Sequence, residues 1–138
     1  MALFEIPADT RGKQDQASDP NQSVWVSANA GSGKTHVLAS RVIRLLLQGV
    51  APARILCLTF TKAAAANMAA RVFGTLAGWT QLADAELCAQ IVATGAPTPG
   101  SQELRAARML FARALEAPGG LKIQTIHAFC ERLLHSFP

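Results

Sequence analysis

The sequence predicts an α/β fold in which a parallel sheet is flanked by helices. Three short apolar runs of strand length, residues 24–26, 54–60 and 121–126, alternate with longer segments that predict helices, either from apolar residues at helical spacing or from high alanine content. Strands that alternate with helices are typical of βαβ units, in which neighbouring strands run parallel. Half of the 138 residues are apolar, so the chain has enough apolar side chains for one buried core.

The predicted elements follow in order along the chain. Residues 1–22 are polar and contain the turn-forming stretch SDPNQS, which predicts an irregular lead-in. The β-branched and aromatic run 24–26 predicts a short buried strand, and residues 34–48 predict a helix that Gly49 ends. The run 54–60 is almost continuously apolar, which predicts a parallel strand covered on both faces. The remaining elements are an alanine-rich helix over 62–76, a helical insertion over about 77–121 with helices at about 81–93 and 101–116, a strand over 121–126 and a third core helix over 127–137.

Charge and cysteine content narrow the class of protein. Thirteen Lys and Arg against nine Asp and Glu give a net charge of +4, which permits a polyanionic partner without requiring one. The three cysteines, Cys57, Cys88 and Cys130, lack metal-ligand spacing, so we expect buried thiols of a reducing compartment. The start of the chain does not resemble a leader peptide, and no apolar run approaches membrane-spanning length. The expectation is a cytoplasmic protein with no membrane partner.

The stretch SANAGSGKTHVL, residues 27–38, fits the phosphate-loop pattern [A/G]-x-x-x-x-G-K-[S/T]. Glycines let backbone N–H groups turn toward a phosphate, the following helix adds its positive end, and a lysine reaches the terminal phosphates. The threonine hydroxyl can ligate Mg²⁺, so we expect ATP and Mg²⁺ as cofactors, with Lys34 and Thr35 as the catalytic pair. The alternative is a glycine turn beside an ordinary surface lysine. The residues expected to contact the nucleotide are Ala28, Asn29, Ala30, Gly31, Ser32, Gly33, Lys34, Thr35 and His36.

The second strand leads into TFTKAAAANM, where polar and aromatic side chains follow the carboxyl end of the strand. This edge is where open α/β sheets bind ligands. Hydroxyls and a lysine suit phosphodiesters, and an aromatic ring suits a base. The residues predicted to contact single-stranded DNA here are Thr59, Phe60, Thr61 and Lys62. The alternative is that Phe60 lies in the core and the threonines cap the next helix.

The third strand leads into a similar junction, which carries Thr125 and His127. A single histidine at such a position is more often a helix cap or a packed ring than a ligand. Two polar junctions in one sheet beside a phosphate loop nevertheless favour a strand of nucleic acid lying across the edge of the sheet.

Three stretches, ANAGSGKTHVLASRVIRLLL, ILCLTFTKAAAANMAARV and IQTIHAFCERLL, resemble motifs I, Ia and TxH of UvrD/RecB-type superfamily 1 DNA helicases. The resemblance spans about residues 14–137, and Asn67 departs from the glutamate usual at its position. It implies that Gln14 matches the Q-motif glutamine that reads adenine. It also implies a P-loop NTPase (RecA-like) motor domain, incomplete, over residues 23–138, after a lead-in over 1–22 that carries the Q motif.

The resemblance is strongest to helicase/nuclease subunits that repair double-strand breaks in bacteria. It implies an ATP-dependent helicase of 3′-to-5′ type that acts on single strands and duplex ends, together with a second, AddB-like partner subunit. The sequence has no apolar strand followed by the Asp-Glu pair of such motors. We therefore expect the chain to be the N-terminal piece of a larger protein. The alternatives are a small-molecule kinase and a nucleotide-binding module without turnover.

Overall fold

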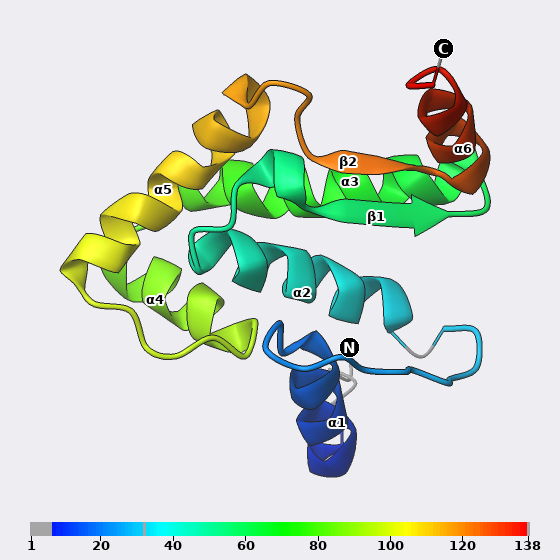
Figure 1. The fold of residues 1–138 in the computed structure, drawn as a ribbon. Helices are drawn as coiled ribbons and strands as arrows, with labels where there is room; N and C mark the ends of the chain where they lie inside the picture. The colour runs from blue at the N-terminus through cyan, green and yellow to red at the C-terminus, as the bar shows by residue number, and fades with distance from the viewer. Residues whose placement is uncertain (1–6, 32, 138) are drawn as a thin grey trace.

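Helices dominate the structure, a computed structural model that describes residues 7–31 and 33–137. Within these residues, six α-helices and one short 3₁₀ helix accompany a two-stranded sheet (Figure 1). The mixed α/β class is therefore confirmed. The elements are α1 (Ala8–Ser18), α2 (Lys34–Leu47), the 3₁₀ helix η1 (Pro52–Arg54), β1 (Leu56–Thr59), α3 (Lys62–Trp79), α4 (Asp84–Ala93), α5 (Ser101–Glu116), β2 (Lys122–Thr125) and α6 (Ile126–Leu134).

The two strands of the sheet run parallel, as predicted. Leu56 pairs with Lys122 and Thr59 pairs with Thr125, so the carboxyl ends of both strands meet at one edge. The strand predicted over residues 24–26 is wrong, because this segment pairs with no strand among the described residues and Trp25 is 94% exposed. A β-branched and aromatic run becomes a strand only where a neighbour accepts its hydrogen bonds.

One face of the sheet is covered and the other is open. Helix α3 packs against both strands. Because side chains alternate along a strand, Leu56 and Leu58 point to the open face and are 44% and 42% exposed. The prediction that β1 is covered on both faces is therefore wrong for the described residues.

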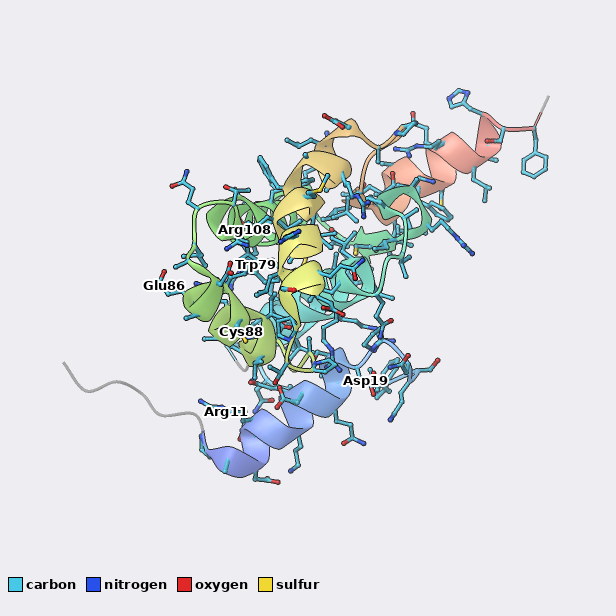
Figure 2. All side chains as sticks on the ribbon, turned by 90° about the vertical axis from the view of Figure 1, so that its left-hand side faces the viewer. Arg11, Asp19, Trp79, Glu86, Cys88 and Arg108 are labelled. Atoms are coloured by element: carbon cyan, nitrogen blue, oxygen red, sulfur yellow. The ribbon has the colours of Figure 1, made fainter. Side chains whose placement is uncertain are left out.

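The hydrophobic core lies among four helices. Helices α2 and α5 pack against α3, and α4 packs against α5. The helices predicted within the insertion are confirmed, and their buried side chains belong to the same core as those of α2 and α3. Trp79, labelled in Figure 2, is fully buried. It donates a hydrogen bond from Nε1 to Gln90 Oε1 at 2.9 Å. The largest fully buried apolar residues are Leu46, Val72, Leu76, Trp79, Leu87 and Ile91.

The lead-in contains a helix that the sequence pattern did not predict. Helix α1 covers Ala8–Ser18, and Ser18 is its one buried residue among those described. It lies against α2, below it in Figure 1. Because α1 has no apolar stripe, its attachment to the molecule depends on polar contacts.

Two further expectations about burial are wrong. Helix α6 was expected in the core, yet none of its residues is buried and Leu134 is 74% exposed. The cysteines were expected to be buried, yet Cys57 and Cys88 are half-buried and Cys130 is exposed. Burial raises the pKa of the Cys57 thiol. In the part of the chain that the structure describes, no helix is both long and apolar enough to cross a bilayer.

Candidate functional site

The glycine-rich loop bends through two left-handed residues. Gly31 has a φ of 81° and Gly33 has a φ of 85°, values that side-chain-bearing residues rarely adopt. Helix α2 begins directly after Gly33, whose carbonyl accepts the Val37 N–H at 3.0 Å. The loop therefore leads straight into a helix N-terminus, where backbone N–H groups and the helix dipole favour an anion. Ser32, which was predicted to contact the nucleotide, lies outside the described residues.

Lys34 turns back over this loop. Its Nζ donates hydrogen bonds to the carbonyl oxygens of Ala28 at 2.6 Å and Asn29 at 2.7 Å. The ammonium thus lies at the mouth of the bend, where it can exchange two carbonyl oxygens for phosphate oxygens. Thr35 and His36 occupy the first turn of α2 and are exposed, and Ala30 is exposed in the loop.

Gln14 on α1 lies against the loop. A side-chain carbon at position 33 would lie 3.1 Å from Gln14 Nε2, so the amide fills the space that the glycine leaves. Gln14 and His36 also line one cavity of about 480 Å³, whose wall is completed by Thr94 at the end of α4. The structure therefore brings together three predicted nucleotide-site residues from two segments of the chain, Gln14 on α1 and Gly33 and His36 at the start of α2. A cavity of this size suits a nucleotide-sized ligand.

Two arginines of α2, which the sequence interpretation did not single out, hold the end of α1. Arg41 donates to the carbonyl oxygens of Ala17 at 3.3 Å and Gln22 at 2.6 Å, and also to that of Asp19. Arg44 donates to the carbonyl oxygen of Asp15 at 3.0 Å. We call Arg41 and Arg44 the arginine clamp. Arginines in an otherwise amphipathic helix give no sequence signal of this role, because their partners are mostly backbone carbonyls of a distant segment.

Asp19 is part of the same contact region. Its carboxylate accepts hydrogen bonds from the backbone N–H and side-chain amide of Asn21, both at 3.0 Å, and lies 3.7 Å from Arg44 Nη2. The backbone hydrogen bond from Asn21, followed by its side-chain hydrogen bond and the positive charges of Arg44 and Arg41, lowers the pKa of Asp19. Figure 2 shows Asp19 at the end of α1 that meets the rest of the molecule, with Arg11 nearer the opposite end.

The residues predicted to contact DNA gather at the carboxyl edge of the sheet. Thr59 and Thr125 are paired across β1 and β2, so their junctions lie next to each other. Phe60 is 84% exposed, and Lys62 is exposed at the start of α3. His127 is exposed on the first turn of α6. This edge thus offers hydroxyls, an aromatic ring and one cation to the solvent.

The threonines at this edge also cap helices. Thr61 Oγ1 accepts the Ala64 N–H at 3.1 Å, and Thr125 Oγ1 accepts the Ala128 N–H at 3.2 Å. The capping alternative stated for the first junction is therefore confirmed for Thr61, the cap made by Thr125 was not predicted, and the alternative that Phe60 lies in the core is wrong. A hydroxyl that accepts a capping bond still carries one donor, so capping leaves a hydrogen for a phosphate oxygen.

The glycine loop with its predicted nucleotide-site residues lies on the same side of the molecule as the sheet edge with the predicted DNA contacts. In Figure 1 the start of α2, the arrowhead of β1 and the start of α6 are all on the right of the view.

A metal site made of protein side chains alone is not found in residues 7–31 and 33–137, where no three His, Cys, Asp or Glu side chains gather so that they could hold a metal ion. A bound Mg²⁺ would take its protein ligand from the Thr35 hydroxyl and the rest from phosphates and water, a mode common for this ion.

Comparison with known proteins gives the family. The family model described as "UvrD/REP helicase N-terminal domain" matches residues 10–138. The chain belongs to the UvrD/REP helicase family. The resemblance that the three motifs indicated is therefore confirmed. No solved structure matches the chain.

Curated relatives of this UvrD/REP-family chain are each named as a subunit of an "ATP-dependent helicase/nuclease". The chain is 32% identical over 137 residues to that of Latilactobacillus sakei, covering 99% of this chain and 13% of the relative. It is 39% identical over 125 residues to that of Levilactobacillus brevis, covering 90% and 8%. It is 36% identical over 119 residues to that of Bacillus pumilus, covering 84% and 8%. The chain thus spans about one eighth or less of these relatives.

Proposed function

We propose that this chain forms the nucleotide-binding and single-stranded-DNA-binding portion of an ATP-dependent DNA helicase. The observation that carries the proposal is the glycine loop at the start of α2, where Lys34 covers the bend and Gln14 lies against Gly33. Membership of the UvrD/REP helicase family and relatives named as helicase/nuclease subunits support a role in DNA repair, together with a second subunit of AddB type. Residues 23–138 would then be part of a P-loop, RecA-like motor domain.

Each residue of the loop has a distinct part in this proposal. Lys34 exchanges its bonds to the Ala28 and Asn29 carbonyls for bonds to the β- and γ-phosphates, and Thr35 supplies a hydroxyl to Mg²⁺. Mg²⁺ bound with ATP would neutralise charge on the phosphate oxygens. Gln14 faces the base, because an amide offers one donor and one acceptor to the adenine edge.

The exposed junctions after β1 and β2 support the DNA part of the proposal. Phe60 provides a stacking surface, and the hydroxyls of Thr61 and Thr125 retain a donor for phosphate oxygens. A small-molecule kinase would have no use for an exposed ring and paired hydroxyls along a sheet edge. The edge therefore favours the helicase over the kinase.

Replacement of Lys34 tests the nucleotide site. Lys34→Ala removes a charged hydrogen-bond donor worth about 1.5–3 kcal/mol, so we expect Mg-ATP to bind about 10- to 150-fold more weakly. A fluorescent ATP analogue, titrated into wild type and variant, measures the two Kd values. Arg105→Ala is the charge-matched control, because Arg105 is exposed on α5 and its loss changes net charge equally.

The result separates the candidate functions. Equal weakening by Lys34→Ala and Arg105→Ala would mean that only the net charge matters, and the nucleotide site would be refuted. Selective weakening by Lys34→Ala without any binding of single-stranded DNA would favour the nucleotide-binding module or the kinase. In a full-length helicase, Lys34→Ala is expected to abolish ATP hydrolysis and unwinding together.

A further inference from the structure

Helix α1 is held in place by polar contacts that converge on Arg44. The Arg44 side chain is 13% exposed, and its Nη1 donates to Asp15 O at 3.0 Å and Ser18 Oγ at 2.9 Å. Its Nη2 lies 3.7 Å from Asp19 Oδ1. Since α1 buries no residue other than Ser18 among those described, these bonds and those of Arg41 take the place of an apolar contact.

The loop after α4 also packs against the guanidinium of Arg44. Gly95, which follows the C-cap residue Thr94 of α4, has a φ of +85°, and a Cβ at this position would lie 2.9 Å from Arg44 Nη1 and 3.3 Å from Asp15 Oδ1. Gly95 therefore leaves the space that Arg44 occupies. The loop after α4 and the end of α1 are thus both packed against one arginine.

The consequence of this packing reaches the nucleotide site. Gln14 directly precedes Asp15 on α1, and its Nε2 contacts the glycine loop. Thr94 directly precedes Gly95 and lines the same cavity as Gln14 and His36. Arg44 therefore contacts Asp15 and Gly95, the chain neighbours of Gln14 and Thr94, on two sides of this cavity.

We propose that Arg44, packed against Gly95, is a positioning residue that holds Gln14 at the nucleotide site and sets its preference for adenine. The inference rests on the proposed function, because it assigns the cavity beside Gln14 to the base. Lys34 is anchored on the carbonyl oxygens of Ala28 and Asn29 in the loop itself, so we expect displacement of α1 to change the choice of base and to leave phosphate binding by Lys34 intact. A two-bond contact to the adenine edge discriminates by about 5- to 150-fold.

A pair of glycine variants tests this role. Gly95→Ala and Gly49→Ala impose the same backbone strain, because φ is +85° and +84°, but nothing lies within 4 Å of a Cβ at Gly49. Gly95→Ala adds the collision with Arg44. Competition of ATP, GTP and inorganic tripolyphosphate against a fluorescent ATP analogue gives the affinities. We expect Gly95→Ala to lower the ATP-to-GTP affinity ratio at least about fivefold with tripolyphosphate affinity unchanged, and Gly49→Ala to keep the wild-type ratio.

A second set of variants separates positioning from loss of structure. Arg44→Lys keeps the charge but has one nitrogen in place of the guanidinium fork, so it cannot hold Asp15, Ser18 and Asp19 together. We expect it also to lower the ratio. In the Gln14→Ala background Gly95→Ala should cause no further change in the ratio, because the effect passes through Gln14.

Each outcome bears on the inference. A wild-type ATP preference that survives both Gly95→Ala and Arg44→Lys overturns the positioning role and leaves the nucleotide site standing. An equal drop in ratio with and without Gln14 overturns it as well, since the effect would not pass through the amide. A wild-type protein that binds none of the three probes removes the proposed function and the inference together.

Discussion

Phe60 combines high exposure with a position at the carboxyl edge of the sheet, and this combination indicates a ligand. An aromatic ring that is 84% exposed directly after β1 gains little from folding, so its apolar surface is available to a base. We expect Phe60→Ala to weaken binding of a single-stranded oligonucleotide by about 5- to 150-fold, which corresponds to about 1–3 kcal/mol for one stacked base. Fluorescence anisotropy of a labelled oligonucleotide measures this at several salt concentrations, and the salt slope should stay unchanged because no charge is lost.

Phe137 supplies the control for this substitution. It is 70% exposed near the end of the described residues and lies outside the sheet edge. Phe137→Ala should leave DNA affinity as in wild type. Equal losses from both substitutions would mean that exposed aromatic surface binds DNA without a defined site.

At the scale of elements, the two helices that begin at the sheet edge depend on threonine caps. Thr61→Ala removes the oxygen that accepts the Ala64 N–H at the start of α3, so we expect a loss of about 1 kcal/mol in the free energy of unfolding. Thr61→Ser keeps an oxygen at this position and should keep most of the stability. Urea denaturation followed by circular dichroism measures both variants. An unchanged midpoint in Thr61→Ala would show that the cap is not made in solution.

The helices that the sequence predicts are those with a local signal of their own. Helix α2 places apolar side chains at helical spacing, and α3, α4 and α5 are rich in alanine; all four were predicted within a few residues. Helix α1 was missed because its contacts are made by Arg41 and Arg44, which lie far along the chain. The segment 24–26 has the composition of a strand, but its structure depends on a neighbour that the described residues do not supply.

In the candidate site too, some features follow from local sequence patterns and others depend on residues that are distant along the chain. The loop around Lys34 and the junctions at Thr59 and Thr125 follow from local patterns and their order along the chain. A place for Gln14 in the nucleotide site was accessible only through family resemblance, since nothing local links a polar lead-in to the loop, and its contact with Gly33 was not predicted. The part played by Gly95 could not be predicted, because the space it leaves is defined by Arg44 from another helix.

At the scale of the whole molecule, the two tryptophans represent opposite environments. Trp25 is 94% exposed, and Trp79 is 0% exposed with a hydrogen bond to Gln90. We expect Trp79→Ala to lower the free energy of unfolding by about 3–5 kcal/mol and Trp25→Ser to change it by less than about 0.5 kcal/mol. Urea titrations of the two variants give both values.

Trp25→Ser should also make the 138-residue chain less prone to self-association. The open face of β1 and the segment 24–26 expose large apolar side chains, and such surfaces associate in water. Light scattering at increasing concentration measures the association of wild type and variant. A destabilisation by Trp25→Ser as large as that by Trp79→Ala would mean that the ring at position 25 is covered in solution.

The parallel pairing of β1 with β2 also bears on how the chain folds. Along the chain, the three helices α3, α4 and α5 separate β1 from β2, so the sheet joins segments that are distant in sequence. Helices α3, α4 and α5 follow one another along the chain and can pack through contacts between near neighbours, whereas the strand pair must close the long loop that these three helices span. During synthesis β1 emerges well before β2 and waits with an unpaired edge until the helices have formed. We therefore expect strand pairing to be the slow, late step of folding, and the unpaired β1 edge to be the route by which nascent chains misassemble.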